Sequence, residues 1–61
     1  MYIRLTEITG AEYLINFDYV AGIKLIDKEQ EKYTVYVNNE DIQYIIVDKK
    51  EYQKIIDILS Y

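Results

Sequence analysis

The spacing of hydrophobic residues in this chain changes once, near residue 47. Before that point, apolar and polar residues alternate in short runs, which is typical of strands that bury one face. After it, apolar residues recur every three or four positions, which is typical of a helix that buries one stripe. A chain of 61 residues with this pattern predicts a single small α+β domain spanning residues 1–61.

Five segments alternate as strands do, and residues that favour turns separate them. Gly10 can adopt the positive φ of a tight hairpin turn. Asn16 and Asp18 favour side-chain-to-backbone hydrogen bonds, which predict a break or a single helical turn. Charged and amide residues predict a loop at 27–32 and a turn at 38–41. The expected strands are residues 2–8, 12–17, 20–26, 33–37 and 42–47.

A helix is predicted at the C-terminus. Asp48 and Glu51 have the spacing of a capping box, in which Asp48 accepts from an early helix amide and Glu51 reaches back to Asp48. Val47 and Tyr52 occupy the two positions of a hydrophobic staple. The apolar stripe then predicts a helix of about 11 residues with one core face. Its members are Tyr52, Ile55, Ile56 and Leu59.

Together these elements predict an α+β fold. We expect a five-stranded antiparallel meander, curled or barrel-like, with one C-terminal helix packed on it. The helix would cover the open face of the sheet. This arrangement would bury the alternating Ile and Leu residues of the strands against the helix stripe.

The composition excludes most catalytic chemistry. With no Cys or His, the chain has no disulfide, no thiolate zinc site, no cysteine nucleophile and no imidazole base. Glu7 and Glu12 flank an exposed hairpin tip, where nothing would desolvate them. Residues 38–41 lack the alternate spacing of a calcium loop. We therefore expect no enzyme activity, catalytic residue, cofactor or metal.

The charge balance argues against direct binding to nucleic acid. Eleven acidic residues outnumber seven basic ones, for a formal net charge of −4, whereas phosphate-backbone binding needs clustered Lys and Arg. The longest apolar run, residues 44–47, is far shorter than the ~20 residues of a membrane-spanning helix. The N-terminus lacks the apolar stretch of a signal peptide. We expect a cytoplasmic protein that makes no contact with a membrane.

The chain is unusually rich in tyrosine, which supplies eight of its nine aromatic residues. Tyr33 and Tyr36 are three apart on one strand, so they point to opposite faces. Tyr is favoured at protein interfaces because it buries area while keeping a polar tip. It is also simply a good strand residue, and both interpretations stay open. The expected partner surface consists of Tyr2, Tyr13, Tyr33 and Tyr36.

The small core favours association. A chain of this length buries only about 60% of its unfolded surface, and no disulfide reinforces it. We therefore expect a small non-catalytic interaction protein, of bacterial or phage origin, that forms a homo-oligomer or docks on a larger protein. The alternative is an acidic inhibitor that mimics nucleic acid and occupies a basic groove of a host or defence protein.

A pattern that spans most of the chain consists of Ile3-Arg4-Leu5-Thr6, Gly10, Leu14-Ile15-Asn16, Val20, Ile23 and the hairpin-strand residues Thr34-Val35. An amphipathic C-terminal helix follows it. This pattern resembles the flagellar FlbD-type family of small bacterial proteins. The chain departs from the family pattern at residues 38–41, which are not a Gly-Lys type turn, and at 58–61, which replace a basic tail. The resemblance implies a bacterial cytoplasmic accessory role in motility, with no catalytic residues.

The same strand pattern is also similar to part of the LytTR-type DNA-binding domains. That likeness implies binding to DNA. The acidic balance of this chain argues against carrying that activity over, because the DNA backbone attracts clustered positive charge.

Overall fold

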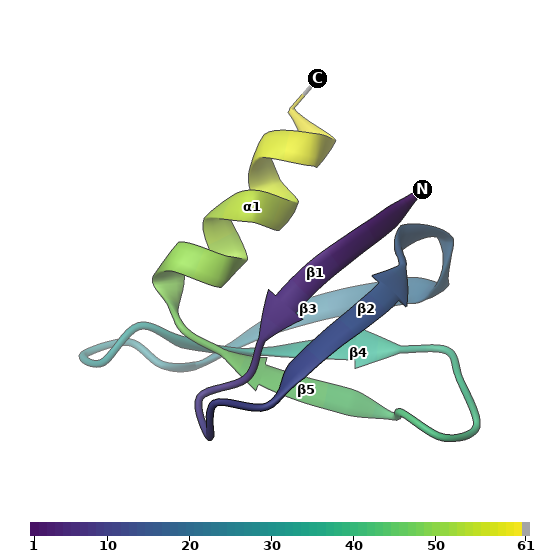
Figure 1. Ribbon diagram of the computed structural model, residues 1–61. Coiled ribbons are helices and arrows are strands. Elements are labelled where there is room, and N and C mark those ends of the chain that lie inside the picture. The colour runs from purple at the N-terminus through teal and green to yellow at the C-terminus, as the bar shows by residue number, and fades with distance from the viewer. Residues whose placement is uncertain (61) are drawn as a thin grey trace.

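The computed structural model describes residues 1–60, in which five strands precede one helix (Figure 1). The predicted α+β class is confirmed. Each expected strand is present, with ends that differ by a few residues, and the helix has the expected 11 residues. No helix in this part of the chain is both long and apolar enough to cross a membrane. The elements are β1 (Tyr2–Thr6), β2 (Glu12–Asn16), the 3₁₀ turn η1 (Phe17–Tyr19), β3 (Val20–Asp27), β4 (Lys32–Val37), β5 (Tyr44–Val47) and α1 (Lys49–Leu59).

The predicted five-stranded meander is wrong, because the strands form two antiparallel sheets. One sheet contains β1 and β2, and the other contains β3, β4 and β5 in chain order. The division falls at η1, where Asn16 Oδ1 accepts a hydrogen bond from the Asp18 amide at 3.1 Å. The Val20 amide donates to the Phe17 carbonyl and closes the turn. This turn redirects the chain, so β3 begins a new sheet and does not pair with β2.

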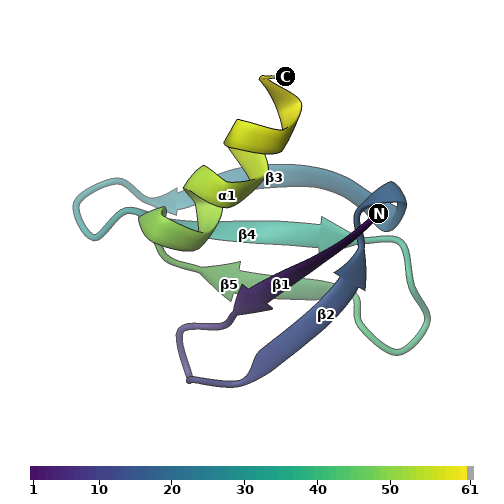
Figure 2. The same ribbon diagram turned by 45° about the horizontal axis from the view of Figure 1, so that its top comes forward.

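The predicted barrel is also wrong, because the two sheets stay separate in the described chain and pack face to face, with no strand of one pairing along a strand of the other. The Ile8 amide donates to the Ile46 carbonyl at 3.0 Å, which links the chain after β1 to β5. The Asn38 amide donates to the Tyr19 carbonyl at 2.7 Å, which extends the β3–β4 pairing by one position beyond Val20 and Val37. Figures 1 and 2 show the β1–β2 hairpin crossing the three-stranded sheet on the side that also carries α1. The fold is therefore an open two-layer arrangement.

The hydrophobic core lies between the three-stranded sheet and the layer made by the hairpin and the helix. Alternation and register place the core residues opposite one another: Ile3 faces Ile15 in the hairpin, and Val35 faces Ile45 in the sheet. Fully burying one such side chain is worth about 1.5–3 kcal/mol. The buried apolar residues of the described chain are Ile3, Leu5, Ile15, Val35, Val37, Ile45, Val47 and Ile55.

The start of α1 differs from the predicted capping box in the role of Glu51. The Asp48 carboxylate accepts from the Glu51 amide at 3.1 Å, as predicted. The Glu51 carboxylate, however, turns to the hairpin: Glu51 Oε1 accepts from the Thr6 amide at 2.7 Å and from Lys54 Nζ at 3.0 Å. Glu51 is only 5% exposed. The prediction that Glu51 reaches back to Asp48 is therefore wrong, because the amide at the end of β1 takes its place.

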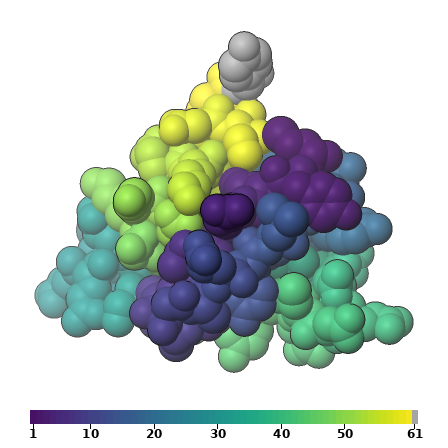
Figure 3. Space-filling view, viewed as in Figure 1, coloured from purple at the N-terminus to yellow at the C-terminus, as the bar shows by residue number. Residues whose placement is uncertain are grey.

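The helix moves away from the sheet along its length. Near its start, the Tyr52 ring stacks on Tyr33 with centroids 3.8 Å apart, and Ile55 is fully buried. Leu59, at the end of the predicted stripe, is 62% exposed. Figure 1 shows the last turn standing clear of the sheet, and Figure 3 shows the helix packed beside the N-terminal strand. The stripe is therefore core at its beginning and surface at its end.

Replacing Glu51 by Leu removes the acceptor of the Thr6 amide. An unpaired buried N–H costs about 1–3 kcal/mol, so we expect the free energy of unfolding to fall by that amount in urea denaturation. Glu51→Gln keeps an oxygen acceptor and should lose less. The matched control is Glu12→Leu at an exposed position, expected within about 0.5 kcal/mol of the parent. A loss in Glu51→Leu no larger than in the control would contradict this role.

The two glycines are expected to respond to Ala in opposite directions. Gly10 has φ +96°, a conformation that costs an L residue about 1–2 kcal/mol, so Gly10→Ala should destabilise the fold. Gly22 lies in β3 without a positive φ, and an added Cβ would meet no atom within 4 Å. Gly22→Ala should therefore stabilise the fold by about 0.4–1 kcal/mol. Urea denaturation of both variants at low protein concentration is the measurement, and changes of the same sign would contradict the prediction.

Candidate functional site

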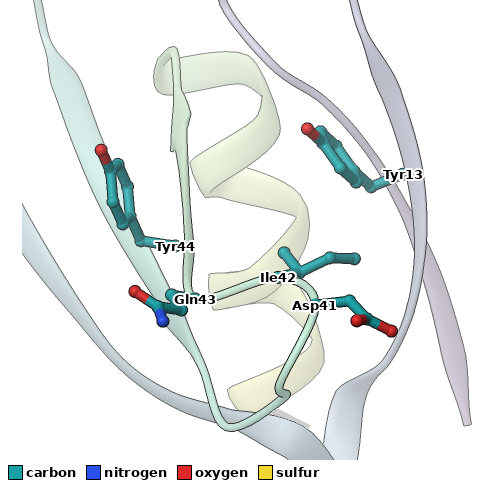
Figure 4. A pocket seen from close by; sticks show the side chains of 5 residues that line it. All are labelled: Tyr13, Asp41, Ile42, Gln43 and Tyr44. Carbon is teal, nitrogen blue, oxygen red and sulfur yellow. The ribbon is translucent and has the colours of Figure 1, made fainter.

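Two neighbouring hollows lie between the β1–β2 hairpin and the loop before β5, and Ile42 lines both. The larger has a volume of about 280 Å³ and is drawn in Figure 4. The smaller has a volume of about 100 Å³ and is lined in part by Tyr2, Leu14 and Tyr19. The larger hollow is lined by Tyr13, Asp41, Ile42, Gln43 and Tyr44.

Asn39 fixes the loop that carries one side of the larger hollow. Its Oδ1 accepts hydrogen bonds from the Asp41 amide at 2.8 Å and from the Ile42 amide at 3.3 Å. The Val37 amide donates to the Gln43 carbonyl at 3.0 Å and closes the loop. An Asn side chain that bonds its own following backbone in this way imitates a turn. The predicted turn at 38–41 therefore also positions the residues that line the hollow.

The larger hollow combines aromatic and acidic groups. Figure 4 shows Tyr13, from β2, and Tyr44, at the start of β5, on opposite sides, with Ile42 between them. Asp41 and Gln43 complete the lining. Aromatic ring faces attract cations, and a carboxylate accepts charge-assisted hydrogen bonds. The arrangement is thus suited to a cationic group with an apolar stem.

The four tyrosines predicted for a partner surface occupy different places. Tyr13 lines the larger hollow, and Tyr2, which is 64% exposed, lines the smaller one. Tyr33 is half-buried and stacks on Tyr52. Tyr36 is exposed and lies directly across from Tyr44 on one sheet face, but it lines neither hollow. The structure thus groups Tyr2 and Tyr13 around Ile42 and leaves Tyr33 and Tyr36 elsewhere.

Several lining residues were not among the predicted site residues. Tyr44 lies opposite Tyr36 in the hairpin. Counting back from the expected turn at 38–41 would have placed Gln43 opposite Tyr36, so the observed register differs by one residue. Tyr19 is held in η1, and Asp41 and Ile42 lie in the loop before β5. Ile42 was expected at the start of a strand over residues 42–47, whereas β5 begins at Tyr44 and Ile42 lies in the loop, where its amide donates to Asn39 Oδ1.

The remaining acidic groups do not assemble into a second site. In the hairpin register Thr6, and not Glu7, lies opposite Glu12. Glu7 Oε1 accepts a hydrogen bond from Thr9 Oγ1 at 2.7 Å, so the two carboxylates at this tip do not pair. Among residues 1–60, no group of three or more acidic side chains is placed to hold a metal ion.

Comparison with known proteins found no matching family model, no matching curated protein and no matching solved structure. The resemblance to the flagellar FlbD-type family therefore stays a prediction. What the two hollows can bind is therefore argued from their lining residues alone.

Asn39→Ala should loosen the loop at the larger hollow. Removing Oδ1 leaves the Asp41 and Ile42 amides without their acceptor, and a net loss of about 1 kcal/mol corresponds to roughly fivefold faster amide exchange at these two positions. Hydrogen exchange followed by NMR measures this. Asn38→Ala is the matched control, because the Asn38 bond to Tyr19 uses the backbone amide. Equal effects of the two variants would contradict the role of the Asn39 side chain.

Proposed function

We propose that this chain is a small non-catalytic interaction protein, and that the hollow around Ile42 receives an Arg side chain of a larger protein partner. The observation that carries the proposal is the grouping of two tyrosine rings with one carboxylate, Asp41, around a hollow of about 280 Å³. Tyr and Arg dominate the energetics of many protein interfaces. Because the tyrosines and the carboxylate lie on this acidic chain, the complementary Arg would belong to the partner.

The chemistry of Arg fits each part of the lining. The guanidinium is planar, so it can stack on the Tyr13 or Tyr44 ring. Its N–H groups can donate to the Asp41 carboxylate. The apolar stem of the Arg side chain would contact Ile42. The formal net charge of −4 would also speed the approach of a basic surface.

The proposed source and cellular role of the protein are based on the sequence. We propose a bacterial or phage protein of the cytoplasm, and the likeness to the flagellar FlbD-type family supports an accessory role in motility. We propose a non-catalytic role because the sequence has no His and no Cys, which are the side chains that most often act as general base and as nucleophile.

The nucleic-acid mimic is less well supported. Such a protein would present its carboxylates as one stripe at phosphate-like spacing. Here Glu29 and Glu31 lie in the β3–β4 turn, whereas Glu40 and Asp41 lie in the β4–β5 loop. Figure 1 shows these two connections at opposite ends of the three-stranded sheet. Glu31 also forms an ion pair with Lys49 at 3.3 Å.

The proposal is tested by NMR titration of the chain with N-acetyl-arginine methylamide. We expect selective shifts of the Asp41, Gln43 and Tyr44 amides, with a dissociation constant on the order of 1 mM for a single side chain. Tyr44→Ala and Asp41→Asn should each weaken binding by about 2–5-fold, the effect of one cation–π contact or one exposed ion pair.

Two controls make the titration decisive. The citrulline analogue has the shape of arginine without its charge and should not produce these shifts. Tyr36→Ala removes a tyrosine that lies directly across from Tyr44 but outside the hollow, so it should leave binding unchanged. Equal binding of citrulline, or equal loss in Tyr36→Ala and Tyr44→Ala, would overturn the proposed site.

A further inference from the structure

The strand β5 has one side that pairs with β4 and one side that pairs with no strand. In an antiparallel pair, every second residue turns its N–H and C=O away from the neighbouring strand. The Val37 amide donates to the Gln43 carbonyl, so the odd-numbered residues of this segment bond β4, and Tyr44 and Ile46 turn their backbone groups to the open side. Ile46 bears this direction out, because its carbonyl accepts from the Ile8 amide.

The backbone of Tyr44 has no such partner. Among residues 1–60, no other hydrogen bond engages its outward N–H or C=O. Tyr44 is 55% exposed and lines the larger hollow, which Figure 4 shows open between Tyr44 and Tyr13. One free donor and one free acceptor therefore lie at the edge of the hollow in which we place the arginine of the partner.

We propose that the arginine-bearing segment of the partner is extended and pairs antiparallel with Tyr44. The arginine N–H donates to the Tyr44 carbonyl, and the Tyr44 amide donates to the arginine carbonyl. One residue makes both bonds, as in each hydrogen-bonded pair of an antiparallel ladder. The inference rests on the proposed function, because it names the backbone conformation of the segment whose arginine enters the hollow.

This pairing places the arginine side chain where the lining can receive it. Residues directly opposite in antiparallel strands point to the same face, with Cβ atoms about 4.5–5.5 Å apart. The side chain of the arginine then runs beside the Tyr44 ring, on which its guanidinium can stack. Asp41, in the loop before β5, also lines the hollow and can accept from the guanidinium. The backbone and the side chain of the arginine thus find partners together.

The other strand edges are less suited to this segment. Side chains of α1 already bond the outward groups of β1, and two register shifts interrupt the edge of β3. On β2, the central outward residue is Leu14, which offers no aromatic face to a guanidinium. Arg4 lies directly across from Leu14, so an arginine paired there would share a face with a like charge.

The pairing also defines the kind of partner. Inside a helix, the N–H and C=O of a residue bond the helix itself, so an arginine there has neither group to offer. An extended tail or an exposed loop has both. The positions on either side of Tyr44 are occupied, because Ile46 accepts from Ile8 and the Ile42 amide donates to Asn39. The partner is therefore an extended segment that is recognised at one arginine.

Two methylated forms of the arginine probe test the backbone bonds. Methylating the arginine α-nitrogen of N-acetyl-arginine methylamide removes the N–H that donates to Tyr44. We expect the NMR titration to show binding about fivefold weaker, the effect of one lost hydrogen bond. N-acetyl-arginine dimethylamide is the matched control, because its added methyl replaces the N–H that points away from β5, and it should bind as the parent probe does. Equal binding of the two methylated forms would overturn the pairing.

Amide exchange locates the bond on the chain. At a concentration of the parent probe about ten times its dissociation constant, exchange of the Tyr44 amide should slow about tenfold, because only the unbound fraction exposes it. The Ile45 amide, which faces β4, and the Leu14 amide on β2 are the controls and should exchange as in the free chain. Slowing at Leu14 in place of Tyr44 would put the segment on the other edge and contradict the inference.

The two proposals fail separately. If the parent and both methylated probes bind equally, with the expected losses in Tyr44→Ala and Asp41→Asn, the arginine site stands and the backbone pairing falls. If none of the arginine probes binds, the arginine site itself falls.

Discussion

The hydrogen bond between the Glu51 carboxylate and the Thr6 amide ties the helix to the β1–β2 hairpin, and together these two elements form the layer that covers the three-stranded sheet. It joins the first turn of the helix to the end of the first strand across 45 residues of chain, and it gives an acceptor to an amide that no strand pairs with. The stack of Tyr52 on Tyr33 fixes the same turn against the sheet. Because both restraints act at its beginning, the helix is anchored at one end and departs from the sheet at the other.

Local structure could be predicted from the sequence because its causes lie within a few residues. Asn16 and Asp18 indicated the turn that became η1, and Asp48 indicated the helix start, since these side chains bond amides two or three positions away. Strand pairing has no such local cause. The same turn at residues 16–19 can either return the chain beside β2 or send it into a new sheet, and long-range contacts decide. The meander was wrong for this reason, and Glu51 was misassigned because its partner Thr6 is remote.

In the candidate site, too, local features could be predicted from the sequence and long-range contacts could not. Alternation indicated that not all tyrosines point inward, but it could not tell which of them share a surface. Tyr13 and Tyr44 belong to different sheets, and they line the same hollow, one side of which is the loop that Asn39 stabilises. The sequence alternation does not distinguish Tyr33 from a strand residue whose side chain faces solvent. In the structure, however, Tyr52 of the helix stacks on the Tyr33 ring and covers it. Which face of a strand becomes a surface depends on what packs over it.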